Sequence, residues 1–370
     1  MEQSKDCTDG FFSYGKAGCC RSIARPLFLA PLAGATERAF RSACARLGSA
    51  QGVTELVSAR GIRYSGLGAS MHYLEIDPST EGPVSIQLFG FDPEDFRFAC
   101  AAILEDPRLS QLTALDINMG CPVPKVVKTG AGSALMCEPE RAVEIVKACR
   151  AIMEPAGVPV TCKFRKGFSA NENTALNFAL KMAEAGVSLL CLHARTRAQM
   201  YSGEADHNVT REVHEGLIKA GYHIPLIANG DIDTVAKARQ ILEEKICEGL
   251  MIGRAAMQNP FLFRQLAWQL WPETCPEAWS KVDWIQDERL PVPFALRVSL
   301  MREVYEGLCL RRGEDLASRE CRSLMLKLMG GFPQAARLRK AASELKDRAA
   351  WISFFCDLSQ TFGAGAGGEI

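Results

Sequence analysis

Eight short apolar segments recur along residues 1–254 of the chain, and longer amphipathic segments lie between them. Because these segments are hydrophobic almost throughout, they are typical of parallel strands that are covered on both faces. The predicted strands are Leu27–Leu32, Gly52–Leu56, Val84–Leu88, Ala114–Asn118, Val158–Phe164, Ser188–His193, Pro225–Ala228 and Gly249–Ile252. The predicted helices are Thr36–Leu47, Pro93–Leu104, Pro139–Ile152, Asn173–Ala185 and Thr234–Leu242. This alternation predicts an α/β fold, a (β/α)₈ TIM barrel. An open doubly wound sheet is the alternative, but no Gly-x-Gly-x-x-Gly follows the first strand.

Each predicted strand ends in, or is followed by, polar residues or a glycine. A barrel places all eight carboxyl ends on one side, so these groups would surround a single pocket. They are Gly34, Glu55, Gln87, Asn118 with Cys121, Lys163 with Arg165, His193 with Arg195, Asn229 with Asp231, and Gly253 with Arg254.

The loops after the last two predicted strands have the composition of a phosphate site. Gly230 and Gly253 let backbone N–H groups approach an anion, the following helix N-terminus adds its dipole, and Arg254 can form a fork. Alternatively, the two glycines only make tight turns. We therefore predict that a phosphorylated cofactor or substrate lies over the barrel.

A cysteine follows the fourth predicted strand, in the run Asn118-Met-Gly-Cys-Pro122. Gly120 permits unusual backbone angles and Pro122 fixes its own φ, so Cys121 would be held in a stiff frame. Such a frame suits a catalytic thiol. The alternative is a buried, inert cysteine, as expected for most of the 15 cysteines here.

Two further strand-end residues suggest a heterocyclic cofactor. Lys163 would point inward and requires an anion, which could be a reduced cofactor or, alternatively, Glu55 or Asp116 in an ion pair. Gln87 offers a donor and an acceptor, which suits the edge of a heterocycle, although it could also cap a loop.

The composition limits where the chain acts. It has no apolar h-region near its N-terminus and no segment as long as a membrane span, so we expect a cytoplasmic protein without a membrane partner. The cysteines form no CxxC pair and no zinc-like cluster, so we expect reduced thiols and no metal.

Amphipathic helices follow the predicted barrel, which indicates a C-terminal helical bundle domain. Residues 291–350 contain 12 Lys/Arg and 7 Asp/Glu, an excess of five positive charges in a chain that is neutral overall. This segment is either a surface for an anionic ligand or an ordinary solvated helical face. The predicted parts are an N-terminal extension at 1–25, the barrel with the active site at 26–270, a linker at 271–291, the helical domain at 292–358 and a disordered tail at 359–370.

An ordered set of motifs resembles the tRNA-dihydrouridine synthase family. The matching runs are APLAGAT at 30–36, QLFG at 87–90, DINMGCP at 116–122, GAGSALM at 130–136, KFR at 163–165, HARTR at 193–197, NGDI at 229–232 and GRAA at 253–256. The resemblance continues weakly at GGFP, residues 330–333. Leu32 stands where family members commonly have methionine, a change that conserves volume.

The resemblance implies an FMN-binding barrel, followed by a helical domain that grips RNA. It implies reduction of the C5–C6 bond of uridines in tRNA with NADPH, in which Cys121 protonates C5 while the flavin delivers hydride to C6. It places around FMN the residues Pro31, Leu32, Ala33, Gln87, Lys163, His193, Asn229, Gly230, Asp231, Gly253 and Arg254. It assigns Asn118, Arg165 and Arg195 to the substrate. Cys121 should then stay protonated near neutral pH, and Lys163 should stabilise the anionic reduced flavin.

The basic residues of the helical segment are the candidates for contacts with the RNA backbone. They are Arg311, Arg312, Arg322, Lys327, Arg337, Arg339 and Lys340. Three alternatives stay open: the same chemistry on ribosomal RNA, a small-molecule FMN oxidoreductase of the dihydropyrimidine type, and a non-catalytic RNA-binding factor. We expect a monomer.

Overall fold

The computed structural model describes residues 12–16 and 18–362. Within these residues, eight parallel strands form a barrel in the order β3-β11-β10-β9-β8-β7-β6-β4, and the bridge between Phe28 and Gln51 closes it between β3 and β4. The strands are β3 (Leu27–Leu29), β4 (Gly52–Val53), β6 (Val84–Phe89), β7 (Ala114–Met119), β8 (Val160–Gly167), β9 (Leu189–Thr196), β10 (Leu226–Asn229) and β11 (Gly249–Ile252). A short strand, β5 (Val57–Ser58), also pairs with β6. The predicted TIM barrel is confirmed, and each predicted segment overlaps one of its strands.

The register of the strands aligns their polar ends. Asn118 on β7 lies opposite Lys163 on β8, Arg165 lies opposite His193 on β9, and His193 lies opposite Asn229 on β10. Since paired residues point to the same side of a sheet, these side chains form a continuous row inside the barrel.

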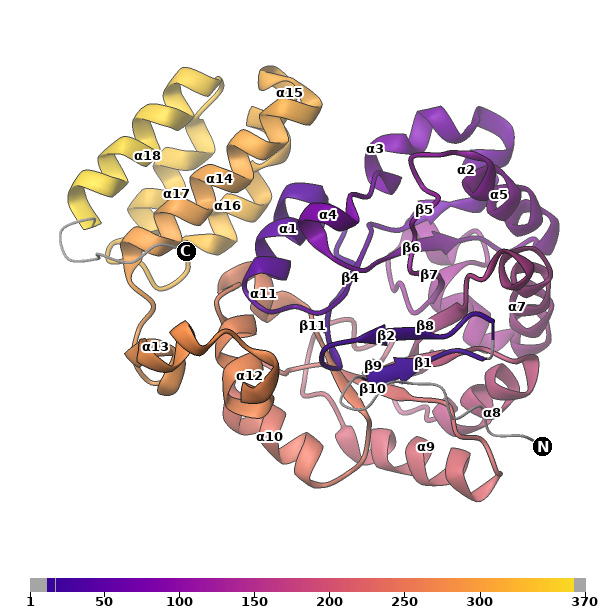
Figure 1. The fold of residues 1–370 in the computed structure, drawn as a ribbon. Coiled ribbons are helices and arrows are strands. Elements are labelled where there is room, and N and C mark those ends of the chain that lie inside the picture. The colour runs from indigo at the N-terminus through magenta and orange to yellow at the C-terminus, as the bar shows by residue number, and fades with distance from the viewer. Residues whose placement is uncertain (1–11, 17, 363–370) are drawn as a thin grey trace.

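Helices surround the barrel, and the C-terminal helices form a separate layer beside it (Figure 1). The surrounding helices are α1 (Arg38–Arg46), α2 (Ala59–Ser65), α5 (Pro93–Glu105), α7 (Pro139–Met153), α8 (Ala175–Ala185), α9 (His207–Lys219), α10 (Val235–Glu243) and α12 (Leu262–Leu270). Helix α9 lies between β9 and β10, where no helix was predicted. Among the described residues, no helix is both long enough and apolar enough to cross a membrane.

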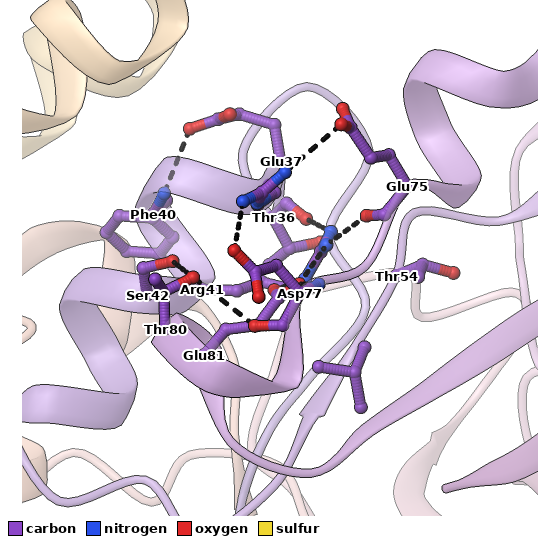
Figure 2. Close-up of polar contacts among 12 residues, drawn as sticks. Thr36, Glu37, Phe40, Arg41, Ser42, Thr54, Glu75, Asp77, Thr80 and Glu81 are labelled. Carbon is purple, nitrogen blue, oxygen red and sulfur yellow. Dashed lines mark hydrogen bonds and ion pairs between the residues drawn. The ribbon is translucent and has the colours of Figure 1, made fainter. Parts of the chain in front are cut away.

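A buried ion pair fixes α1 to the segment that precedes β6 (Figure 2). Arg41 Nε donates to Glu81 Oε2 over 2.6 Å, and the two side chains are 2% and 0% exposed. Glu81 ends the short helix α4 (Pro78–Glu81). Arg38 adds more exposed pairs with Glu75 and Asp77. Helix α1 is therefore tied to residues 75–81 by three ion pairs.

An N-terminal hairpin closes the barrel at the amino ends of its strands. It consists of β1 (Phe12–Tyr14) and β2 (Arg21–Ile23), which pair antiparallel. Tyr14 belongs to the same apolar cluster as Phe28 and donates from its hydroxyl to Gln51 Oε1 over 3.0 Å. Arg21 donates to the carbonyl of Thr113, just before β7. Residues 12–16 and 18–25 thus close this end of the barrel, whereas residues 1–25 were predicted only as an N-terminal extension; residues 1–11 and 17 lie outside the described residues.

A C-terminal helical region is present, as predicted. It comprises α14 (Phe294–Arg312), α15 (Glu314–Glu320), α16 (Arg322–Leu328), α17 (Ala335–Glu344) and α18 (Arg348–Phe362). Ion pairs of Arg46 with Glu303 and of Glu37 with Arg311 join α1 to α14. One apolar cluster runs continuously from the barrel helices into this region. Residues 359–362 belong to α18 and not to the predicted tail, while 363–370 lie outside the described residues.

Candidate active site

A cavity of about 690 Å³ lies at the carboxyl ends of the barrel strands. Its size falls in the usual range for cofactor and small-ligand sites. Thirteen of the fifteen predicted site residues line it: Pro31, Leu32, Ala33, Asn118, Cys121, Lys163, Arg165, His193, Asn229, Gly230, Asp231, Gly253 and Arg254. Gln87 and Arg195 do not line the cavity.

The loop that carries Cys121 is held by hydrogen bonds. Asn118 Oδ1 accepts from the N–H of Gly120 over 3.2 Å and from the N–H of Cys121 over 2.9 Å. Ser133 Oγ donates to the Cys121 carbonyl over 2.9 Å. Gly120 does not have a positive φ, so the loop does not use the backbone freedom that a glycine permits there. Hydrogen bonding, and not glycine geometry, makes this loop rigid.

Burial raises the pKa of the Cys121 thiol, despite an opposing hydrogen bond from the backbone of Val123 and the opposing charges of Arg165 and Lys163. The thiol therefore stays protonated near neutral pH. In that state it can donate a proton and is a poor nucleophile.

Lys163 is a half-buried cation in the same cavity as this thiol. Its Nζ donates to Asn229 Oδ1 over 2.9 Å, and Asn229 in turn donates to the Met251 carbonyl. Burial lowers the pKa of Lys163. The alternative ion pair with Glu55 or Asp116 is not formed, because Glu55 accepts from the N–H of Gly34, and Asp116 accepts from Gln87 and Thr161. An ammonium group has three donors, so Lys163 can also serve a ligand in the cavity.

Arg195 is buried behind the cavity wall, where it binds the cavity residue Asp231. It is 2% exposed and donates to both oxygens of Asp231, to Asp231 Oδ1 over 2.8 Å. Arg254 donates to the same Oδ1 over 2.9 Å. Burial acts to raise the pKa of Asp231, but hydrogen bonds from Arg195 and the Ala205 N–H hold it below its usual value. Arg195 thus positions Asp231, and through it Arg254; its predicted contact with substrate has no support in this geometry.

The two glycine loops differ in the space they leave. A Cβ at Gly230, where φ is +120°, would lie 2.8 Å from Ala205 Cβ. A Cβ at Gly253 would meet nothing nearer than 3.7 Å, so this glycine borders open space in the cavity. Gly253 directly precedes the short helix α11 (Arg254–Gln258).

The N-terminus of α10 is already occupied by the protein itself. The N–H groups of Val235 and Ala236 donate to the carboxylate of Glu288, from the segment that follows α12. The prediction that the helix after the seventh strand adds its dipole to a phosphate site is therefore wrong for α10. After the last strand, Gly253 and Arg254 remain available to an anion in the cavity.

Tyr201 and Lys327 are among the cavity residues that were not predicted as such from the sequence. Tyr201 lies in the loop after β9, and its ring centre is 4.7 Å from the guanidinium carbon of Arg254 and 5.8 Å from that of Arg165. Lys327 reaches the cavity from α16, with Nζ 3.5 Å from Met257 Sδ. Lys327 was predicted only as an RNA contact. In the sequence, the only indication that Tyr201 could belong to the site is its position shortly after the HARTR motif at 193–197.

The other predicted RNA contacts fall into two groups. Arg311, Arg312 and Arg322 are engaged with Glu37, Glu320 and the Leu345 carbonyl. Arg337, Arg339 and Lys340 are exposed on α17. Only the second group, together with Lys327, presents cationic groups that are largely accessible.

A barrel with these groups at its strand ends matches the family model described as dihydrouridine synthase over residues 28–360. The chain belongs to the dihydrouridine synthase family. Like its other members, it is an enzyme, an oxidoreductase, as predicted. It is 39% identical to tRNA-dihydrouridine synthase B of Pseudomonas putida over 241 residues, which are 65% of this chain and 67% of that protein. It is 34% identical to tRNA-dihydrouridine synthase B of Pseudomonas aeruginosa over 322 residues, 87% and 89% of the two chains.

Solved structures show the same fold at low sequence identity. A 6-hydroxypseudooxynicotine amine oxidase from Pseudomonas geniculata superimposes with a TM-score of 0.53 and 11% identity, over 80% of this chain and 52% of that one. A 2-naphthoyl-CoA reductase gives a TM-score of 0.52 and 10% identity, over 69% and 51%. In the described part of the chain, no cluster of three or more His, Cys, Asp or Glu could hold a metal ion.

Proposed function

We propose that this enzyme reduces the C5–C6 double bond of uridines in tRNA to 5,6-dihydrouridine, using FMN and NADPH. The observation that carries the proposal is the presence, in one cavity, of a thiol whose pKa is raised and of a half-buried lysine on the neighbouring strand. Such a pair offers one proton donor and one cation. The family membership and the names of the relatives support uridine as the substrate.

The cavity residues fit FMN. Gly253 borders space that a Cβ would fill, and the adjacent Arg254 can fork to a phosphate. Lys163 is half-buried, and among the described residues its only hydrogen-bond acceptor is Asn229, so it would suit a negatively charged ring. When bound, FMN would supply the hydride for C6. Residues 31–33 would form the apolar part of its site.

The protein's own residues would supply the proton and the orientation. Cys121 Sγ would donate its proton to C5. Asn118 and Ser133 hold Cys121 in place through hydrogen bonds to its backbone N–H and carbonyl. Arg165 is buried, and it donates to the carbonyls of Gly120 and Thr196, so it ties the Cys121 loop to β9 while lining the cavity. Tyr201 offers an aromatic face at the cavity. The target base has to leave its stack to reach these groups.

The helical region favours RNA over a free base as substrate. Lys327 brings a cation from this region into the cavity. The exposed basic residues of α17 lie in the same region but outside the cavity. A substrate that touches both would have to be much larger than a pyrimidine. Phosphate contacts of this kind bind without reading sequence, so they suit a structured RNA.

The test measures dihydrouridine in unmodified tRNA after incubation with FMN-loaded enzyme and NADPH. We expect Cys121→Ala to lower the rate by at least about 10²-fold, because general acid catalysis contributes on that order. The flavin absorbance and the tRNA affinity should not change. Cys137→Ala is the matched control, because Cys137 is an exposed thiol outside the cavity. Equal turnover on free uracil would favour the small-molecule reductase, and unchanged activity in Cys121→Ala would contradict the proposed chemistry.

A further inference from the structure

Below the cavity, a chain of hydrogen bonds connects three neighbouring strands. Asp116 accepts from Gln87 Nε2 and from Thr161 Oγ1, each over 2.6 Å. Gln87 Oε1 accepts from Asn118 Nδ2 over 2.8 Å. Asn118 Oδ1 then accepts from the backbone N–H of Cys121. The ladder register explains the contacts, because Gln87 and Thr161 both lie directly opposite Asp116.

All of these side chains are buried, and Gln87 is completely so. Its amide is satisfied at both ends by protein groups, which explains why it does not reach the cavity. The prediction that Gln87 contacts the cofactor therefore has no support here. Its position suggests a different role, which depends on the donor-to-acceptor direction of these hydrogen bonds.

The carboxylate at one end sets this direction. Both oxygens of Asp116 accept hydrogen bonds, which is the pattern of an ionised carboxylate, and such a group has no donor. Gln87 must therefore turn its NH₂ group towards Asp116 and its oxygen towards Asn118. Asn118 must then turn its NH₂ group towards Gln87, which leaves its oxygen facing the loop. In the opposite orientation, the Asn118 NH₂ group would face the N–H of Cys121 and repel it.

The state of Asp116 is held by its surroundings. Burial raises the pKa of Asp116 above its usual value, and the hydrogen bonds from Thr161 and Gln87 and the charge of Lys163 oppose that rise. The two hydrogen bonds are made to the ionised form, so they favour it. The chain and the charge thus stabilise each other.

We propose that Asp116 is a positioning residue for Cys121, which acts through Gln87 and Asn118 to hold the thiol-bearing loop at the cavity wall. The role of the thiol itself rests on the proposed function. The position of the loop does not, so it can be tested separately.

The first test compares the kinetics of Asp116→Asn and Gln87→Leu with those of the wild type. Asparagine can reverse the amide orientations and leucine breaks the chain, so the thiol is misplaced in both variants. We expect kcat to fall by about 10²-fold, as for a misplacement of about 1 Å, with KM for tRNA and FMN affinity within about twofold. Since both act on one chain, the double variant should lose no more than the worse single one. Losses that multiply, or a rise in KM alone, would overturn the proposal.

The matched control is Ser85→Ala. Ser85 carries a buried hydroxyl on the same strand as Gln87, and this hydroxyl accepts from Gln51 Nε2 over 2.7 Å. Among the described residues, it makes no hydrogen bond to the side chains of Asp116, Gln87 or Asn118. It should lose stability as a buried polar group does, and keep its kcat. A kcat loss in Ser85→Ala as large as that in Asp116→Asn would show a general effect of barrel stability and overturn the proposal.

The second test needs no turnover. The rate at which iodoacetamide alkylates Cys121 is followed against pH by peptide mass spectrometry, with the exposed Cys137 and Cys356 as internal references. We expect alkylation at least about threefold faster in both variants, because the loop is released, and a curve shifted to lower pH only in Asp116→Asn, because only that change removes a negative charge. An unchanged rate at Cys121 in both variants would overturn the proposal. If the wild type makes no dihydrouridine but alkylation responds as expected, the proposed function fails and this inference stands.

Discussion

Breaking the ion pair between Arg41 and Glu81 should destabilise the protein strongly. Arg41 donates to both carboxylate oxygens, and also to the carbonyls of Thr36 (2.8 Å) and Glu75 (2.7 Å). Glu81 also accepts from the N–H of Asp77. Neither charged side chain is more than 2% exposed, so water cannot replace a missing partner (Figure 2).

The expected magnitudes differ between single and double variants. Glu81→Leu and Arg41→Met each leave one buried charge without its partner, so each should cost about 3–5 kcal/mol of unfolding free energy. In the double variant no charge is buried, but the carbonyls of Thr36 and Glu75 lose their donor, which should cost about 2–4 kcal/mol. The double variant should therefore be more stable than the sum of the singles implies, by at least about 2 kcal/mol.

The assay is urea unfolding of the purified full chain, followed by circular dichroism. Arg302→Met is the control, because its i,i+4 pair with Glu306 on α14 is 47% and 39% exposed. That change should cost only about 0.3–0.5 kcal/mol. If both buried single variants cost less than about 1 kcal/mol, or if their effects are additive, the reasoning from burial is refuted.

Three further outcomes are expected. Gly253→Ala should lower FMN affinity at least about tenfold in a fluorescence titration without lowering the stability of the apoprotein, since its φ is −111° and a Cβ there meets no protein atom within 3.4 Å. His193 is kept neutral because burial, helped by nearby cations, puts its pKa well below 6.5. Below pH 6.5, His193 therefore binds a proton in the unfolded chain but not in the folded protein. Stability should therefore fall by up to about 1.4 kcal/mol per pH unit below pH 6.5, and less so in His193→Asn. Lys327→Met should reduce the slope of log affinity for tRNA against log salt by about one, and an unchanged slope would place Lys327 away from the RNA backbone.

The barrel, and most of the residues that line the cavity at its strand ends, could be predicted from the sequence. Strands covered on both faces must be apolar almost throughout, so eight such segments separated by helices left few architectures. Closing the barrel then brought Cys121, Lys163 and Asn229 into one cavity, because the carboxyl ends of parallel strands face the same side. The motif around Cys121 was likewise readable from the sequence.

Only the tertiary structure decided what each polar group contacts. Arg195 pairs with Asp231, and Gln87 lies under the cavity between Asp116 and Asn118. Glu288 occupies the N-terminus of α10, and Lys327 enters the cavity from the C-terminal helical region. Each of these contacts joins residues that are distant in the chain, and depends on ladder register or on how one layer packs on another. A strand pattern shows which side a residue faces, but the partner that it meets there is set by the rest of the fold.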